Sequence, residues 1–252
     1  MVRWSRAIWL LVCLLAAPQL LAAPLTVAVA ANVKYAFDDL QAAFAKESGV
    51  EIRPVFSSAG KIVSQIEGGA PFDVFLSADM EYPEKLYAQK LAVTKPQVYA
   101  YGTLVLWTLK LLDLGKGLSV LTDDGVVKVA LPNPRVAPYG RAAIQALTAQ
   151  KLFPAVEPKL VYGESITQAT QYIDSGAADI GFTAKSVVIA PEMHGRGRWV
   201  ELPKDSYEPI AQGVVILKHG AETQFEAARR FVHFLTSPKA REIFRQYGYL
   251  LP

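Results

Sequence analysis

The sequence predicts an α/β protein of two lobes, each a mainly parallel sheet flanked by helices, with two strands crossing between the lobes. Three observations predict this fold. Short apolar runs alternate with amphipathic helical stretches, a strand–helix–strand–helix–strand plan occurs twice, and long apolar strands lie on either side of the second copy. The chain has 252 residues, 52% of them hydrophobic, which is enough for one large core or two smaller ones.

The first copy of the plan begins at Leu25. The run LTVAVA is continuously apolar, as expected for a buried strand. Apolar residues then recur at the spacing of one helix face until Gly49, namely Val33, Phe37, Leu40 and Phe44. A second strand (EIRPVF), a helix (KIVSQIEGG) and a third strand (DVFLSA) follow at 51–56, 61–69 and 73–78. This order predicts parallel strands covered by helices.

The second copy has strands at VKVALP, PKLVYG and ADIGFT, with helices over 138–150 and 165–175 between them. The apolar runs VYAYGTLVLW and PIAQGVVIL are predicted to carry the chain to the second lobe and back. Two further helices, over 222–235 and 238–246, return to the first lobe. The predicted division is 23–101 for the first part of lobe 1, 102–209 for lobe 2, and 210–252 for the rest of lobe 1.

Residues 1–22 are predicted to be a secretory signal peptide. Arg3 and Arg6 precede an apolar run over 7–17, and small residues lie before a cleavage point after Ala22. The run is shorter than the roughly 20 apolar residues that a membrane helix needs. We therefore expect a soluble protein that is exported to the periplasm.

The composition argues against several classes of function. The only cysteine, Cys13, lies in the predicted signal peptide, so the mature chain would have no disulfide, catalytic thiol or thiolate metal site. Without Arg3 and Arg6, 24 basic residues face 23 acidic ones, a formal net charge of +1. This balance argues against nucleic acid as a partner.

Four junctions between a predicted strand and the next helix carry small or hydrogen-bonding residues, namely AANV (30–33), SSAGK (57–61), APYG (137–140) and GESIT (163–167). In open parallel sheets, ligands bind beyond the carboxyl ends of strands, where helix N-termini offer free N–H groups. SSAGK is not a P-loop, because Val55 and Ile62 stand at two of the defining positions. Each junction alone is typical of an N-cap, with Asn32, Ser58 or Ser165 as the cap. Together they predict an anion site between the lobes.

The sequence resembles the periplasmic molybdate-binding proteins of ABC transporters in four stretches, which follow the signal peptide in the order VAVAANV, FSSAGKIVSQIEGGAPFDVFLSAD, ALPNPRVAPYG and GESITQATQYIDSGAADIGF. QIEGGAPFDVFLSAD is the most specific part, and the closing RQYGYLLP is similar to one branch of the family. The resemblance covers essentially the whole mature chain. It implies a type II periplasmic binding protein that closes over one tetrahedral oxyanion, molybdate or tungstate. It also implies a monomer that serves a membrane permease, is not an enzyme and needs no cofactor.

The resemblance also implies the ligand residues. They are Asn32 after the first strand, Ala59 with Ser58 beside it, Tyr139 at the APYG turn, and Ile166 through its backbone N–H. These residues would contact the metal atom only through the oxygens of the oxyanion. Because Ala59 stands where many relatives have a hydroxyl, this contact would come from its N–H group or from Ser58.

A second departure from the family concerns a tyrosine. Some relatives donate a phenol from a position where this chain has Thr183 and Ala184, and Tyr139 could supply that phenol from another direction. Asp73 and Asp79 flank the third strand and are interpreted as caps or structural acids. Lys61 is interpreted as a solvated helix residue.

Other functions stay open. Sulfate is the closest chemical competitor, because cavity size cannot be read from the sequence. An exported hydrolase has less support, since GESIT is not the Gly-x-Ser-x-Gly elbow. The three histidines, His194, His219 and His233, also lack the spacing of metal ligands. A ferric-iron binder would call for adjacent tyrosines, and the chain has no such pair.

Overall fold

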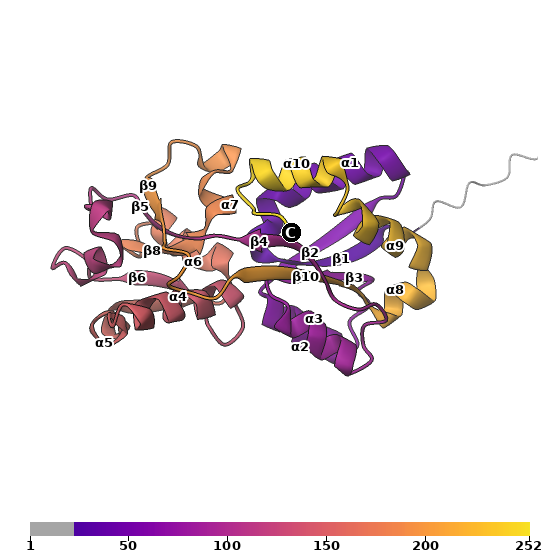
Figure 1. Ribbon diagram of the computed structural model, residues 1–252, viewed down its shortest axis with the longest axis horizontal. Coiled ribbons are helices and arrows are strands. Elements are labelled where there is room, and N and C mark those ends of the chain that lie inside the picture. The colour runs from indigo at the N-terminus through magenta and orange to yellow at the C-terminus, as the bar shows by residue number, and fades with distance from the viewer. Residues whose placement is uncertain (1–22) are drawn as a thin grey trace, which may run out of the picture.

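The computed structural model describes residues 23–252. The predicted signal peptide over 1–22, with Cys13, lies outside these residues. Two five-stranded sheets form two lobes side by side, and the beginning and the end of the described chain belong to the same lobe (Figure 1, indigo and yellow). The predicted two-lobed α/β fold is confirmed.

The first sheet has the strand order β2-β1-β3-β10-β4. Its parallel part is β2-β1-β3, and β10 pairs antiparallel with both β3 and β4. All six residues of β1 are buried, because the strand is central in the sheet, and this explains its continuous apolar sequence. The strands are Leu25–Ala30 (β1), Ile52–Ser57 (β2), Val74–Leu76 (β3), Gln97–Gly102 (β4) and Ile210–Ile216 (β10).

The helices of this lobe are the 3-10 turn η1 (Ala31–Val33), α1 (Lys34–Ser48), α2 (Ala59–Glu67), α3 (Glu81–Ala88), α8 (Lys218–Thr223), α9 (Phe225–Phe234) and α10 (Pro238–Gln246). In Figure 1, α1 and α10 lie above the strands, α2 and α3 lie below them, and α8 and α9 lie at the right-hand end. The rings of Phe44 on α1 and Phe231 on α9 pack edge to face, 5.1 Å apart. The prediction of one helix over 222–235 is wrong. Gln224 adopts φ −144° and ψ 40°, outside the helical region, and separates α8 from α9.

The second sheet has the order β7-β6-β8-β5-β9, parallel over β7-β6-β8 and antiparallel beyond. Its strands are Leu104–Thr108 (β5), Val129–Pro132 (β6), Leu160–Gly163 (β7), Ile180–Ala184 (β8) and Arg198–Glu201 (β9). Its helices are η2 (Leu114–Thr122), α4 (Pro138–Ala149), α5 (Phe153–Val156), η3 (Glu157–Lys159), α6 (Ile166–Asp174), α7 (Lys185–Val188) and η4 (Pro191–Met193). The edge strand β9 has no apolar run, because three of its four residues are exposed.

Two segments carry the chain between the lobes. β4 ends at Gly102 and β5 begins at Leu104, so the predicted apolar run passes from one sheet into the other with one residue between them. The return runs from β9 through 202–209 into β10. The lobe bounds 23–101, 102–209 and 210–252 stay a prediction.

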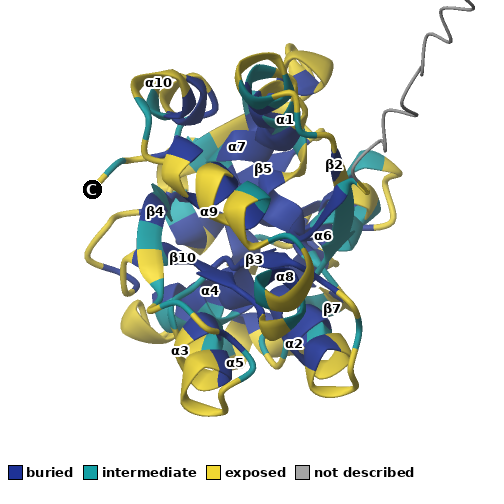
Figure 2. Ribbon diagram, turned by 90° about the vertical axis from the view of Figure 1, so that its right-hand side faces the viewer, coloured by how far each residue is buried: buried dark blue, intermediate teal, exposed yellow. Residues whose placement is uncertain are grey.

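The core lies between each sheet and its helices. In Figure 2 the central strands β3 and β10 are dark blue, whereas the outer strands β2 and β4 are only partly buried. Large side chains such as Phe75, Trp107 and Phe182 are fully buried. Within residues 23–252, none of the helices has the length and hydropathy of a membrane span.

Candidate functional site

Four strand-to-helix junctions, two from each lobe, meet at a small cavity between the lobes. The free space at its centre is only about 10 Å³, roughly what one water molecule needs. Its lining is Ala30, Ala31, Asn32, Ser58, Ala59, Ala78, Ala137, Pro138, Tyr139 and Ile166. The structure therefore brings together all five residues that the sequence pointed to as ligand contacts.

Asn32 lies in η1, between β1 and α1, and is 1% exposed. Its amino group donates to Gln212 Oε1 at 2.9 Å and approaches the Tyr249 hydroxyl at 3.3 Å. Its backbone carbonyl accepts from the Tyr249 hydroxyl at 2.8 Å and from Ser186 Oγ at 3.0 Å. Asn32 Oδ1 has no protein partner within the described part of the chain. The residue is thus held from several sides, and the cap interpretation is wrong for it, because Ala30 and Val33 occupy the cap positions of η1 and α1.

Ser58 occupies the N-cap position of α2, yet its side chain makes no capping bond. The residue is 4% exposed, and Oγ has no partner among residues 23–252. A buried hydroxyl without a partner costs about 1–3 kcal/mol, so its presence calls for an explanation. Beside it, Ala59 opens α2, where backbone N–H groups have no acceptor within the helix. Both the hydroxyl and the helix start can serve a ligand.

Tyr139 lies in the first turn of α4, directly after Pro138, and is 2% exposed. Its hydroxyl oxygen accepts from Gln212 Nε2 at 3.1 Å, which leaves the phenolic hydrogen free to donate elsewhere. Burial, and next the neighbouring Tyr249, raise the pKa of Tyr139 well above its usual range. The hydroxyl therefore stays protonated and remains a donor.

Ile166 opens α6 and is 4% exposed. The preceding Ser165 caps the helix, because its hydroxyl accepts from Gln168 N at 3.3 Å. The cap interpretation therefore holds for Ser165 but not for Ser58. Thr183 is buried on β8, where its hydroxyl lies 2.7 Å from that of Thr170, so it does not replace the tyrosine of some relatives.

The described residues that line the cavity carry no formal charge. The helices α2, α4 and α6 begin there, and each N-terminus contributes roughly half a positive charge together with unpaired N–H groups. A small anion can therefore be held by hydrogen-bond donors alone. The same residues include no set of acid, base and activated nucleophile.

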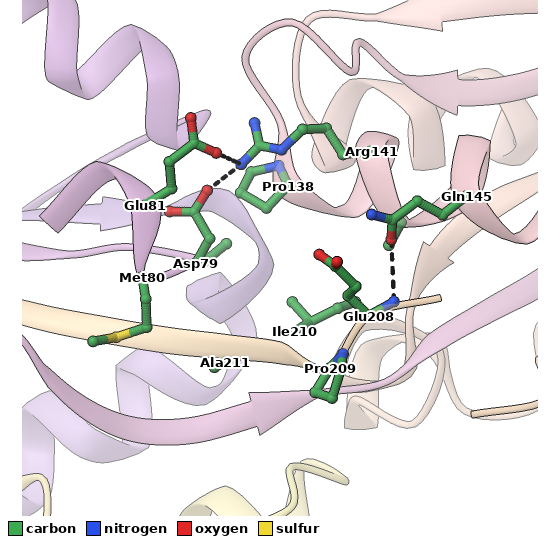
Figure 3. A pocket seen from close by; sticks show the side chains of 12 residues that line it. Asp79, Met80, Glu81, Pro138, Arg141, Gln145, Glu208, Pro209, Ile210 and Ala211 are labelled. Carbon is green, nitrogen blue, oxygen red and sulfur yellow. Dashed lines mark hydrogen bonds and ion pairs between the residues drawn. The ribbon is translucent and has the colours of Figure 1, made fainter. Parts of the chain in front are cut away.

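Contacts between the lobes hold the cavity closed. The N–H group of Gly60 donates to the carbonyl oxygen of Val136 at 2.9 Å. Figure 3 shows a neighbouring pocket in which Arg141 on α4 pairs with Asp79 and, at 3.3 Å, with Glu81 of the other lobe. This pocket shares part of its lining with the cavity. Opening the site requires these contacts to break.

Other charged residues considered in the sequence lie outside the cavity lining. Lys61 pairs with Glu164 of the other lobe. Asp73 is buried, accepts from Thr26 N at 2.7 Å and pairs with His219, so it is a structural acid as expected. Over the described range 23–252, no group of three His, Cys, Asp or Glu residues is arranged to hold a metal ion.

Sequence reasoning missed the residues behind the cavity. Gln212 on β10 is fully buried and bonds both Asn32 and Tyr139. The only signal was a single amide within the apolar run PIAQGVVIL. Tyr249 reaches Asn32 because Leu250 forms a β-bridge with Tyr101, a contact without a local sequence signal.

Comparisons with known proteins agree with this architecture. The sequence profile of the bacterial extracellular solute-binding proteins matches residues 25–250. Two relatives are each named molybdate-binding protein ModA. The one from Rhodobacter capsulatus is 41% identical over 224 residues, which are 88% of this chain and 86% of the relative. The one from Azotobacter vinelandii is 40% identical over 230 residues, which are 90% of each chain.

A solved structure is also similar. The periplasmic molybdate-binding protein of Azotobacter vinelandii matches with a TM-score of 0.84 and 37% identity, covering 90% of this chain and 99% of that one. The matching family profile, the two-lobed fold and the cavity between the lobes agree with one another. This chain belongs to the bacterial extracellular solute-binding protein family.

Proposed function

We propose that this protein binds molybdate, and also tungstate, in the periplasm and delivers it to the permease of an ABC transporter. The names of the two ModA relatives support the ligand, and the uncharged, donor-rich cavity supports an oxyanion. The observation that carries the proposal is the buried Ser58 hydroxyl, which lines the cavity without a protein partner. The predicted signal peptide over 1–22 is the route of export.

The proposed ligand contacts come from both lobes. Asn32 and Ser58, with the N–H group of Ala59, contribute from the first lobe, and Tyr139 with the N–H group of Ile166 contributes from the second. A fully deprotonated dianion only accepts hydrogen bonds, so donors from both sides suit it. Bonds to a charged group contribute about 1.5–3 kcal/mol each. Ligand binding thereby favours the closed form, which we propose is the form that the permease recognises.

We propose that the protein acts as a monomer and has no catalytic turnover. The lining residues suit capture and release, because they offer donors but no group poised to break a bond. No resident cofactor is required, since the metal atom arrives inside the cargo and is contacted only through its oxygens.

The test is an oxyanion panel on the mature protein, stripped of bound anion by unfolding and refolding. We expect molybdate and tungstate to raise the melting temperature, because a ligand in hundredfold excess over Kd stabilises the native state by about 2.7 kcal/mol. Sulfate and phosphate should raise it little. A large shift with phosphate would instead indicate a ligand that donates to the unpartnered Asn32 Oδ1, as a protonated oxyanion can. Equal shifts with sulfate would contradict molybdate as the ligand.

A further inference from the structure

Gln212 lies directly behind two of the proposed ligand contacts without lining the cavity itself. It is on β10, the strand by which the chain returns to the first lobe, and it is fully buried. Gln212 Oε1 accepts from Asn32 Nδ2 at 2.9 Å and from the Tyr99 hydroxyl at 2.8 Å. Gln212 Nε2 donates to the Tyr139 hydroxyl at 3.1 Å. One side chain therefore connects a contact in each lobe.

A primary amide is directional, because its oxygen only accepts and its nitrogen only donates. Since the Tyr139 oxygen receives a hydrogen from Gln212, its own single hydrogen is directed away from Gln212. The Asn32 amino group donates one hydrogen bond to Gln212. Its second hydrogen bond, from Nδ2 to the Tyr249 hydroxyl, is longer, at 3.3 Å. A charged ligand oxygen can compete for that second hydrogen, because charge-assisted bonds are the stronger ones.

The backbone around Gln212 is built to admit this arrangement. Gly102, the last residue of β4, faces the same spot. A Cβ atom at Gly102 would lie 2.7 Å from Gln212 Nε2 and would collide with the Tyr139 hydroxyl. Any larger residue would therefore displace either the amide or the phenol.

We infer that Gln212 is a positioning residue of the oxyanion site, which holds the Tyr139 hydroxyl as a donor toward the ligand and aligns the Asn32 amide. This inference rests on the proposed function. It adds a residue outside the cavity, on the crossing strand, that determines whether the donors of the two lobes meet the ligand in the correct orientation.

The first test is Gln212→Glu, with molybdate affinity measured by titration calorimetry between pH 6.5 and 8.5. An ionised carboxylate only accepts hydrogen bonds, so the Tyr139 hydroxyl would donate to it and not to the ligand. It would also place a negative charge behind the anion. We expect at least 30-fold weaker binding at pH 8.5. Burial raises the pKa of a carboxyl group, so protonation should restore much of the affinity at pH 6.5. The parent should show no comparable pH dependence.

The groups around Gln212 do not supply that pH dependence themselves. They are three buried tyrosines, Tyr99 on β4, Tyr139 on α4 and Tyr249 near the C-terminus. Burial raises the pKa of each. The carboxylate among the charges that act on these tyrosines is Asp79, which further raises the pKa of Tyr99. Burial raises the pKa of Asp79 itself, against the opposing effect of its partner Arg141. A new pH profile in the variant would therefore report the introduced carboxyl group.

The second test is a double-mutant cycle between Gln212→Leu and Tyr139→Phe. If Gln212 acts through Tyr139, Gln212→Leu should weaken binding about tenfold in the parent but less than threefold in the Tyr139→Phe background. Gln145→Leu is the control, because its amide oxygen accepts from the backbone N–H group of Glu208 and the amide has no hydrogen bond to Asn32 or Tyr139. Thermal melts of the ligand-free variants show whether each is folded.

The outcomes separate the two proposals. A parent that binds no oxyanion refutes the proposed function, and this inference with it, before any variant is made. If the parent binds molybdate, equal losses for Gln212→Leu in both backgrounds, or a pH profile of Gln212→Glu parallel to that of the parent, would overturn the positioning role alone. If Gln212→Leu does not fold, the pH profile of Gln212→Glu decides.

Discussion

The substitution Ser58→Ala should change ligand-free stability and ligand affinity in opposite directions. In the closed form, Ser58 Oγ is buried in the cavity without a protein partner, so ligand-free protein in that form carries the desolvation penalty of a hydroxyl. That penalty is about 1–3 kcal/mol. Removing the hydroxyl should therefore raise the melting temperature of the stripped protein, by about 2–4 °C per kcal/mol for a chain of this size.

The same change should weaken molybdate binding. A hydrogen bond from a buried hydroxyl to a charged oxygen contributes about 1.5–3 kcal/mol, which corresponds to a roughly 10- to 150-fold rise in Kd. If the N–H group of Ala59 makes this contact instead, Ser58→Ala will bind as tightly as the parent. Titration calorimetry on stripped protein measures Kd, and differential scanning calorimetry measures the ligand-free melting temperature.

Ser165→Ala is the matched control, because Ser165 stands at the equivalent junction of the second lobe and does cap its helix. Losing an N-cap destabilises by about 1 kcal/mol, so its melting temperature should fall while that of Ser58→Ala rises. A lower ligand-free melting temperature for Ser58→Ala would refute the reasoning, since it would mean that solvent satisfies the hydroxyl in solution.

Two further predictions concern closure and alkaline pH. Arg141→Met removes the ion pair with Asp79 across the cleft without changing the cavity lining, so molybdate affinity should fall about threefold to thirtyfold through faster release. Arg229→Met, the control, breaks an ion pair within α9 and should leave the affinity unchanged. Stopped-flow measurements give the dissociation rate of molybdate from each variant. The free energy of unfolding should fall as pH rises above 10, because the unfolded chain then loses protons that the buried Tyr99, Tyr139 and Tyr249 retain in the folded state. For three residues the limiting slope is about 4 kcal/mol per pH unit. Urea titrations between pH 9 and 11 measure it, and an unchanged midpoint would contradict the raised pKa values.

Local sequence was a good guide to the elements that form the cavity. The continuous apolar run of β1 and the helix starts at Ala59, Pro138 and Ile166 depend on patterns within a few residues. The strand and the start at Pro138 lie as predicted, and the other two helices begin within two residues of the predicted positions 61 and 165. The resemblance to a known family then indicated which residues at these junctions would contact a ligand. All five predicted residues line one cavity, although their contacts with an oxyanion stay a proposal.

Where local pattern and backbone geometry disagreed, the pattern failed. The stretch over 222–235 has helical spacing throughout, but Gln224 leaves the helical region and gives two helices. In the edge strand β9 the pattern was absent although the strand is present. Because three of its four residues are exposed, the strand needs no apolar run.

By itself, the sequence determined the two-lobed α/β plan and the small or hydrogen-bonding residues at four strand-to-helix junctions, since both depend on periodicity and on residue type at helix starts. Only the tertiary structure decided how these groups are used. It separated Ser58 from Ser165, two serines at equivalent junctions, because only the Ser58 hydroxyl is buried without a partner. It also brought Gln212 behind Asn32 and Tyr139, residues 180 and 73 positions away in the chain, because strand crossing and lobe closure create contacts that no local pattern encodes.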